Sequence, residues 1–222
     1  MYRQPRNPPG KILCLHGWGT SPEFMDHQLR NFDKFFPEMK FECMAGPIEI
    51  PEAIINDDSV VKLSPSKKYY SWKLNIFDEV TSGDDMNLSI AMDSICDYIN
   101  KNGPFDGICG FSMGGMVAQN FVEKMEAGAL KDKLKVPGPK FIMLCAPNYF
   151  RTNNDLLKTP SIHLVGDKDF LMEASILITT KYLNPLVLRH AESHKFPKLS
   201  QYEIDAIRRY LKPVLSKPKP KL

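Results

Sequence analysis

Residues 105–120 read FDGICGFSMGGMVAQN, an apolar run that passes through one serine into a helical pattern, with glycines on both sides of the turn. Glycine weakens the interior of strands and helices. This cluster therefore indicates a turn whose backbone requires residues without side chains. The stretch matches Gly-x-Ser-x-Gly, in which a sharp strand-to-helix turn exposes the serine at the sheet edge. Bulky residues two positions either side of Ser112 would collide, which explains Gly110 and Gly114. The position between a buried strand and a helix favours a nucleophilic Ser112 over an ordinary glycine-rich turn.

Short apolar runs alternate with helical patterns along the rest of the chain. This alternation predicts an α/β fold, in which a mostly parallel sheet is covered by helices on both faces. Such sheets carry their sites at the carboxyl ends of the strands. The predicted buried strands are Ile12–Leu15, Gly107–Phe111, Phe141–Cys145, Ile162–Val165 and Leu186–Leu188, with a weaker candidate in KFECMAG near residue 40.

Start and stop signals bound the predicted helices. Ser21 followed by Pro22 predicts one start, and Ser200 with Glu203 predicts a capping box at another. Gly103 is predicted to end a helix as a left-handed cap. Apolar residues at helical spacing mark the buried faces: Met25, Leu29, Phe32 and Phe36; Leu88, Ala91, Met92, Ile95 and Ile99; Val117, Phe121 and Met125; Ile204, Ile207 and Leu211.

Length and composition indicate one domain over residues 1–215, followed by a basic tail over 216–222 that holds much of the net charge of +3. No basic face with interleaved aromatic residues indicates nucleic-acid binding, and no apolar run is long enough to span a membrane. The first residues lack the apolar region of a signal peptide, and the five cysteines show no paired spacing, so we expect a cytoplasmic protein. A monomer and a homodimer are both compatible with the sequence. The segment 46–85 has little periodicity, but its aromatic cluster KKYYSWKL indicates packing.

A nucleophilic serine needs a base and an orienting acid, which in this architecture follow it in the chain in the order acid, histidine. The loop GDKDF after the strand SIHLV offers Asp167 and Asp169. The loop RHAESHKFP after the strand PLVL offers His190 and His194. The residues alone do not choose within either pair.

Two backbone N–H groups are predicted to stabilise a developing oxyanion. The Met113 N–H opens a helix and gains from the helix dipole. The second donor is assigned to the Trp18 N–H, in the turn of LCLHGWGTS after the first strand. In that loop His16 is expected to hold the turn by hydrogen bonding rather than to take part in chemistry.

Other interpretations use the same residues. A metal site could in principle draw on His163, Asp167, Asp169, His190 and His194, but it would leave the serine turn unexplained. GICGFSMGG could cradle a phosphate, but such a loop belongs after the first strand. We therefore expect neither a metal nor another cofactor. His163 is expected to pack in the sheet, and His27 to lie on a solvated helix face.

The sequence resembles the family of small fungal and animal serine hydrolases that includes the ovarian-cancer-associated gene 2 protein. The resemblance runs from about residue 11 to residue 211, through LCLHGWGTS, GPIEIP, YYSWKL, INKNGPFDGICGFSMGG, LVGDKDFLM and HAESHKFP. It implies an α/β-hydrolase fold without a large lid domain and activity on acyl esters or thioesters. In the matching motifs the acid falls on Asp169 and the base on His194, so the resemblance implies a triad with Ser112.

The chain departs from the family pattern in the histidine loop, where Glu192-Ser193 replaces a glycine pair and Phe196 replaces a valine. A stiffer loop could present His194 differently, so a non-catalytic relative that binds a ligand or acts as a scaffold is the alternative. For an active enzyme we expect a small-molecule ester or thioester with an apolar, medium to longer unbranched acyl chain. The candidate residues for contact with the acyl chain are Tyr149, Phe150, Phe170 and the cluster Tyr69 to Trp72. Packing in the protein core would explain each of them equally well.

Overall fold

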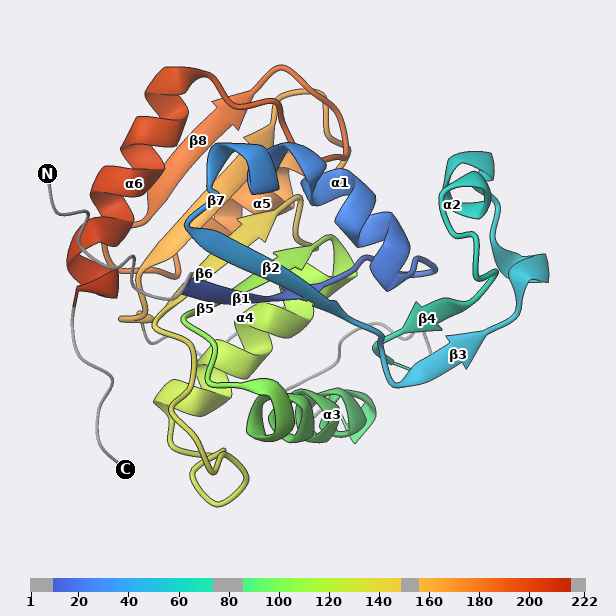
Figure 1. Ribbon diagram of the computed structural model, residues 1–222, viewed down its shortest axis with the longest axis horizontal. Helices are drawn as coiled ribbons and strands as arrows, with labels where there is room; N and C mark the ends of the chain where they lie inside the picture. The colour runs from blue at the N-terminus through green and yellow to red at the C-terminus, as the bar shows by residue number, and fades with distance from the viewer. Residues whose placement is uncertain (1–9, 74–85, 149–155, 217–222) are drawn as a thin grey trace, which may run out of the picture.

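A parallel six-stranded sheet forms the centre of the protein in the computed structural model, which describes residues 10–73, 86–148 and 156–216. The strand order is β2-β1-β5-β6-β7-β8 (Figure 1). The five predicted strands and the weaker sixth candidate are all confirmed. Their bounds are β1 (Gly10–Leu15), β2 (Met39–Met44), β5 (Gly107–Phe111), β6 (Phe141–Cys145), β7 (Ser161–Gly166) and β8 (Leu186–His190).

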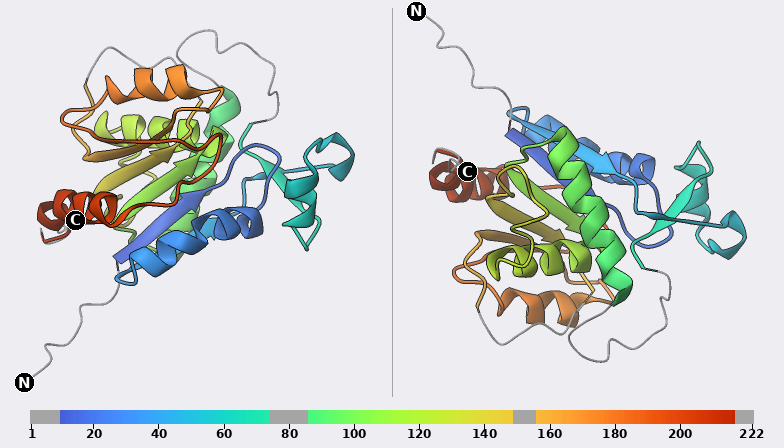
Figure 2. Two further views of the ribbon diagram at one scale, coloured as in Figure 1. Left: turned by 90° about the horizontal axis from the view of Figure 1, so that it is seen from above. Right: turned by 90° about the horizontal axis from the view of Figure 1, so that it is seen from below.

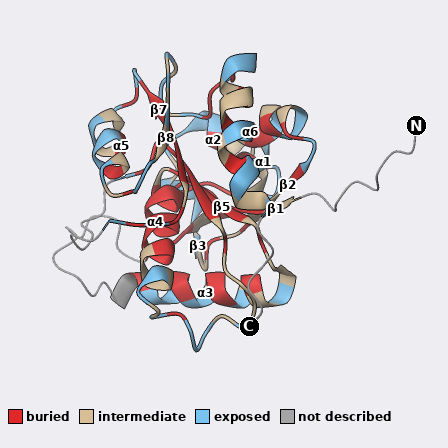
Figure 3. Ribbon diagram, turned by 90° about the vertical axis from the view of Figure 1, so that its left-hand side faces the viewer, coloured by how far each residue is buried: buried red, intermediate tan, exposed pale blue. Residues whose placement is uncertain are grey.

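Helices cover both faces of this sheet, as predicted. Figure 2 shows α1 (Pro22–Phe35) and α6 (Gln201–Leu215) on one face, and α3 (Met86–Asn102), α4 (Met113–Glu126) and α5 (Met172–Thr179) on the other. Each face of the sheet packs against its helices in a separate apolar core, and most residues of β5 and α4 are buried in the middle of the molecule (Figure 3). Burial of this apolar surface is the main favourable contribution to folding. None of the described helices is long and apolar enough to cross a membrane.

The helix ends follow the sequence signals, including the end of α3 at Asn102, directly before Gly103. Ser21 caps α1 by accepting a hydrogen bond from the Phe24 N–H at 3.2 Å, and Ser200 with Glu203 forms the predicted capping box of α6. The prediction of a left-handed Gly103 is wrong, because its φ is not positive. A Cβ at Gly103 would lie 2.4 Å from the carbonyl oxygen of Ile99, so a close approach explains this glycine.

The segment 46–85, whose sequence has little periodicity, contains a small hairpin. β3 (Ile48–Ile50) pairs antiparallel with β4 (Tyr69–Ser71), and η1 (Glu52–Ile54) and α2 (Asp58–Lys62) lie between them. We call residues 48–71 the hairpin segment. It is fixed to the main body by a 2.9 Å hydrogen bond between the hydroxyls of Ser21 and Ser64, and by packing among Phe24, Val60 and Tyr69. Residues 74–85 of the same stretch lie outside the described residues, as do residues 217–222 of the predicted tail. The first residue of that tail, Ser216, caps the end of α6.

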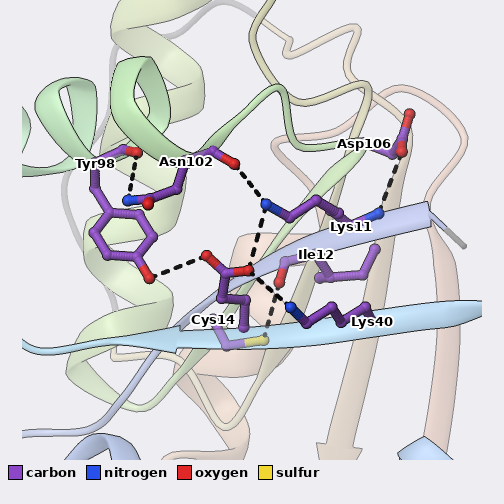
Figure 4. A network of polar contacts seen from close by, with 8 residues as sticks. Lys11, Ile12, Cys14, Lys40, Tyr98, Asn102 and Asp106 are labelled. Carbon is purple, nitrogen blue, oxygen red and sulfur yellow. Dashed lines mark hydrogen bonds and ion pairs between the residues drawn. The ribbon is translucent and has the colours of Figure 1, made fainter.

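A polar network ties the end of α3 to β1 and β2 (Figure 4). The Lys11 ammonium lies 3.3 Å from the Glu42 carboxylate and donates to the Asn102 carbonyl. The Tyr98 hydroxyl donates to Glu42 at 3.1 Å, and the Lys11 N–H donates to Asp106 at 3.3 Å. Lys11 and Asp106 lie where β1 and β5 begin, so the carboxyl ends of these strands remain available for a site.

Candidate active site

Ser112 occupies a strained turn between β5 and α4. Its φ of 52° and ψ of −120° lie outside the regions that non-glycine residues ordinarily adopt. The surrounding structure holds it there, because the Ser112 N–H donates to the Cys145 carbonyl at 3.0 Å and the N–H groups of Gly115 and Met116 donate to the Ser112 carbonyl. Backbone strain of this kind gathers at functional sites.

The glycines beside Ser112 are required by close backbone contacts. A Cβ at Gly110 would lie 2.4 Å from the Gly114 carbonyl oxygen, and one at Gly114 would lie 2.2 Å from the Leu15 carbonyl oxygen. Each clash involves backbone that cannot move aside. The start of α4 is therefore pressed against the ends of β5 and β1, which brings Ser112 beside the loop after β1.

Asp169 and His194 meet at the same edge of the sheet. The His194 Nδ1 lies 2.9 Å and 3.1 Å from the two carboxylate oxygens of Asp169. The Asp169 side chain is 0% exposed, and the Leu171 N–H donates to its Oδ1 at 2.8 Å. A buried carboxylate that accepts from Nδ1 holds the proton on that nitrogen, so Nε2 is left as a hydrogen-bond acceptor.

The competing acid and base have other contacts. Asp167 forms an exposed ion pair with Arg189, at 2.7 Å. Neither ring nitrogen of His190 has a hydrogen-bond partner in the described part of the chain, and burial lowers the pKa of its imidazole. Of the two pairs left open by residue type, the structure thus brings together Asp169 and His194.

The altered histidine loop is firmly packed. Glu192 forms a 2.6 Å ion pair with Lys195, and its carbonyl lies so close to Gly166 that a Cβ there would approach it to 2.7 Å. Phe196 is buried, with its ring centroid 5.4 Å from that of Phe32 and 5.7 Å from that of Phe111. Phe196 therefore fills space beneath the loop, whereas Glu192 and Ser193 lie toward its surface, and His194 still reaches Asp169.

His16 holds the loop after β1, as expected. Its Nδ1 donates to the Gly17 carbonyl at 2.7 Å, and its Nε2 accepts from the Gly46 N–H at 2.9 Å. The Trp72 indole N–H donates to the His16 carbonyl at 2.8 Å. Complete burial lowers the pKa of His16 to about 4, so the ring is neutral at pH 7 and both nitrogens are used in structure.

Acid should therefore destabilise the protein through His16. The folded-state pKa of about 4 lies below the ordinary value of 6.5, so only the unfolded chain takes up this proton as the pH falls between them. From pH 7 to pH 4.5 this histidine should remove about 2 kcal/mol from the free energy of unfolding. Urea unfolding of the wild type and of His16→Gln should show a smaller pH-dependent loss in the variant, while His27→Gln should behave as the wild type. Equal losses in the wild type and His16→Gln would contradict this role.

The two N–H groups predicted to bind an oxyanion belong to the loop after β1 and to the first turn of α4. A Cβ at Gly17 would lie 3.4 Å from the Ser112 Cβ, so the loop after β1 packs against the serine. Met113 is the first residue of α4, where an N–H has no partner within the helix. Among the described residues neither the Trp18 N–H nor the Met113 N–H has an acceptor, so both remain available to a ligand.

A cavity of about 310 Å³ opens beside Ser112 and His194. Its walls come from the loop after β1, from α1, and from the hairpin segment. No hydrogen bond joins Ser112 to His194 in the described part of the chain, and such contacts often tighten only when substrate binds. The wall residues that sequence reasoning missed are Phe24, Gln28, Ile55, Asn56, Asp57 and Val60.

The residues predicted to contact substrate differ in where they lie relative to the cavity. Tyr149 and Phe150 lie outside the described residues. Phe170 is 79% exposed, and its ring lies over His194 with a centroid separation of 4.6 Å. Trp72 and Tyr69 are fully buried and do not line the cavity. The structure therefore corrects the idea that Trp72 lines a pocket and places it in the core beneath the His16 loop.

The residues considered for a metal site do not converge. His163 lies inside β7, where its Nε2 is 3.0 Å from the Ser161 hydroxyl, and burial lowers its pKa to about 3. No group of three or more potential ligands occurs among the residues that the structure describes. His163 is thus a packed residue of the sheet, as expected.

A family model described as serine hydrolase (FSH1) matches residues 6–206. The chain belongs to this serine hydrolase family. The resemblance noted in the sequence is therefore confirmed.

Relatives similar to this chain include several named esterases. Esterase FPY3 of Fusarium mangiferae is 25% identical, covering 93% of this chain and 97% of the relative. Mouse esterase OVCA2 is 24% identical, covering 84% and 89%. An uncharacterised hydrolase, C22A12.06c of Schizosaccharomyces pombe, is 28% identical over 86% of this chain but only 48% of its own length. The chain thus spans about half the length of that relative, and 45% of a second S. pombe relative named dihydrofolate reductase.

Solved structures share the fold. A variant of Arabidopsis thaliana SOBER1 has a TM-score of 0.58 and 18% identity, covering 94% of this chain and 100% of that one. Esterase PE8 has a TM-score of 0.53 and 14% identity, covering 92% of both chains. The family's α/β-hydrolase fold, implied by the resemblance, is confirmed, and the described elements include no large lid domain.

Proposed function

We propose that this chain is a serine hydrolase that cleaves carboxylic esters or thioesters of apolar acyl groups, with Ser112, His194 and Asp169 as its triad. The observation that carries the proposal is the buried Asp169 carboxylate bonded to His194 Nδ1, while His194 and the strained Ser112 border one cavity. Family membership and the esterases among the relatives support the same chemistry.

The reaction is acyl transfer to water. The Ser112 oxygen attacks the substrate carbonyl while His194 Nε2 accepts its proton, and Asp169 stabilises the imidazolium through Nδ1. The N–H groups of Trp18 and Met113 bind the oxyanion, where one good donor can be worth about 3 kcal/mol. His194 then returns the proton to the leaving oxygen or sulfur, which leaves an acyl-serine. Water repeats the attack with His194 again as base, and no cofactor is needed.

A cytoplasmic location is part of the proposal. The described cysteines are all free, and four of them are buried: Cys14, Cys96, Cys109 and Cys145. Unpaired buried thiols suit a reducing compartment. The substrate is expected to be a small molecule, because the cavity beside Ser112 has a volume of about 310 Å³.

A panel of p-nitrophenyl esters tests the proposal. We expect hydrolysis of acetyl, butyryl and octanoyl esters and of octanoyl-coenzyme A, with negligible hydrolysis of octanoyl p-nitroanilide. The value of kcat/KM should rise with acyl length by no more than about fourfold per methylene until the cavity is full, because each buried methylene contributes about 0.8 kcal/mol. A folded protein that hydrolyses no ester or thioester would instead be a non-catalytic relative that binds a ligand or acts as a scaffold.

A further inference from the structure

The apolar wall of the cavity is formed by two parts of the chain that are distant in sequence. Phe24 comes from α1, and Ile55 and Val60 come from the hairpin segment. Ile55 reaches the loop after β1, because a Cβ at Gly19 would lie 3.1 Å from the Ile55 Cδ1. Val60 is buried against Phe24, so the wall is packed from behind. A rigid apolar surface therefore stands beside the loop that carries the Trp18 N–H.

The reaction geometry assigns a direction to the substrate. The leaving oxygen or sulfur must stay within reach of the His194 imidazole, which returns a proton to it. The carbonyl oxygen must point to the N–H groups of Trp18 and Met113. The remaining substituent, the acyl chain, then extends past the loop after β1 toward Ile55 and Val60. The outer face of His194, beside the exposed Phe170, is left for the leaving group.

The rim of this wall carries a negative charge. Asp57 lines the cavity and caps α2 by accepting hydrogen bonds from the Ser59 N–H at 2.8 Å and the Ser59 hydroxyl at 2.6 Å. These hydrogen bonds lower the pKa of Asp57, so its carboxylate is ionised at neutral pH. Of the other polar wall residues, Thr20, Gln28, Asn56 and Ser112 are uncharged and His194 is the triad base. No lysine or arginine of the described residues lines the cavity.

We propose that the space between α1 and the hairpin segment is the acyl subsite, in which Ile55 limits chain length and the Asp57 carboxylate rejects acyl chains that end in a negative charge. This inference rests on the proposed function and adds a substrate class to it: uncharged acyl chains of limited length. The cavity volume of about 310 Å³ is at the lower end of the range for ligand pockets. The expected preference for medium to longer chains is therefore narrowed to chains short enough to fit this volume.

Adjacent isoleucines provide a matched test of chain length. Ile55 lines the cavity, whereas Ile54 is 45% exposed and does not. Ile55→Phe should lower the ratio of the two kcat/KM values, octanoyl to acetyl p-nitrophenyl ester, by about tenfold or more. The phenylalanine ring is larger than the isoleucine side chain and occupies the space of several methylenes of the acyl chain. Because the ratio is measured on one sample, it does not depend on how much of the variant is active, and circular dichroism checks that the variant is folded. Ile54→Phe should leave the ratio unchanged.

Adjacent aspartates provide a test of charge that needs no change in volume. Asp57→Asn keeps a capping side chain on α2, since asparagine caps as well as aspartate. The wild type should prefer the hexanoyl ester to mono-4-nitrophenyl adipate, and Asp57→Asn should reduce this preference by about three- to fivefold, the scale of an exposed charge pair. Asp58→Asn, which alters a neighbouring exposed carboxylate outside the cavity, should not.

The outcomes separate this inference from the proposed function. If the wild type hydrolyses esters but Ile55→Phe and Ile54→Phe keep the same octanoyl-to-acetyl ratio, the acyl subsite lies elsewhere and the inference is overturned. If Asp57→Asn and Asp58→Asn leave the hexanoyl-to-adipate preference equally unchanged, the charge selection is overturned. If the folded wild type hydrolyses no ester, the proposed function itself is contradicted.

Discussion

His194→Ala is expected to lower kcat/KM for a p-nitrophenyl ester by about a thousandfold or more, as the loss of a triad base does in other hydrolases. The Ser112 hydroxyl is a weak nucleophile at neutral pH and needs a base to take its proton. His194 is the histidine that borders the cavity and bonds to Asp169. Steady-state hydrolysis of p-nitrophenyl butyrate would measure the loss.

His190→Ala is the matched control, because it removes a second histidine from the same strand end. His190 makes no ring hydrogen bond to the described residues and does not line the cavity, so its loss should cost far less. A larger loss in His190→Ala than in His194→Ala would mean that the assignment of the base is wrong.

Asp169→Asn is expected to lower kcat by about a hundredfold to ten-thousandfold with little effect on folding. The amide is similar in size, but it can donate to His194 Nδ1 and so favour the tautomer whose Nε2 carries the proton. That tautomer cannot accept the proton of Ser112. The measurement is kcat against pH, compared with the wild type.

Asp167→Asn supplies the control in the same loop. It removes an exposed ion pair with Arg189, and exposed pairs contribute little to stability. Turnover should therefore stay near the wild-type value. If Asp167→Asn were the more damaging of the two variants, the acid would have been assigned to the wrong aspartate.

Much of the fold could be predicted because the central strands β5, β6 and β7 are short runs in which every residue is buried. β5 and β6 were predicted with their bounds, Gly107–Phe111 and Phe141–Cys145, since every residue in them is buried and turn signals end them. Capping chemistry located the starts of α1 and α6. The left-handed conformation predicted for Gly103 is wrong, because the sequence does not distinguish a glycine needed for its conformation from one needed for a close contact.

Two elements could not be read from the sequence pattern. The hairpin segment has strands of three residues and a helix of five, too short to show a period. α5 contains apolar residues on all sides, including Ile176 and Leu177, which are partly exposed, so no amphipathic face indicated it. The position of each depends on tertiary packing.

The candidate site was predictable to the extent that it follows the strand ends. Ser112 directly follows β5, and Asp169 and His194 lie in the loops after β7 and β8. Parallel strands bring such loops to one edge. The acyl wall was not predictable, because Ile55 reaches the site from the hairpin segment. Trp72 belongs to an aromatic cluster that suited either a pocket or a core, and only its packing on His16 decides between them.

Labelling with a fluorophosphonate probe, followed by peptide mapping, tests the central claim most directly. The probe forms a covalent bond only with a serine oxygen that is activated by its surroundings. We expect one adduct per chain, on Ser112, which is lost in Ser112→Ala and kept in Ser193→Ala, where an exposed serine of the histidine loop is removed. Absence of labelling in the folded wild type, or an adduct on any other serine, would contradict the account.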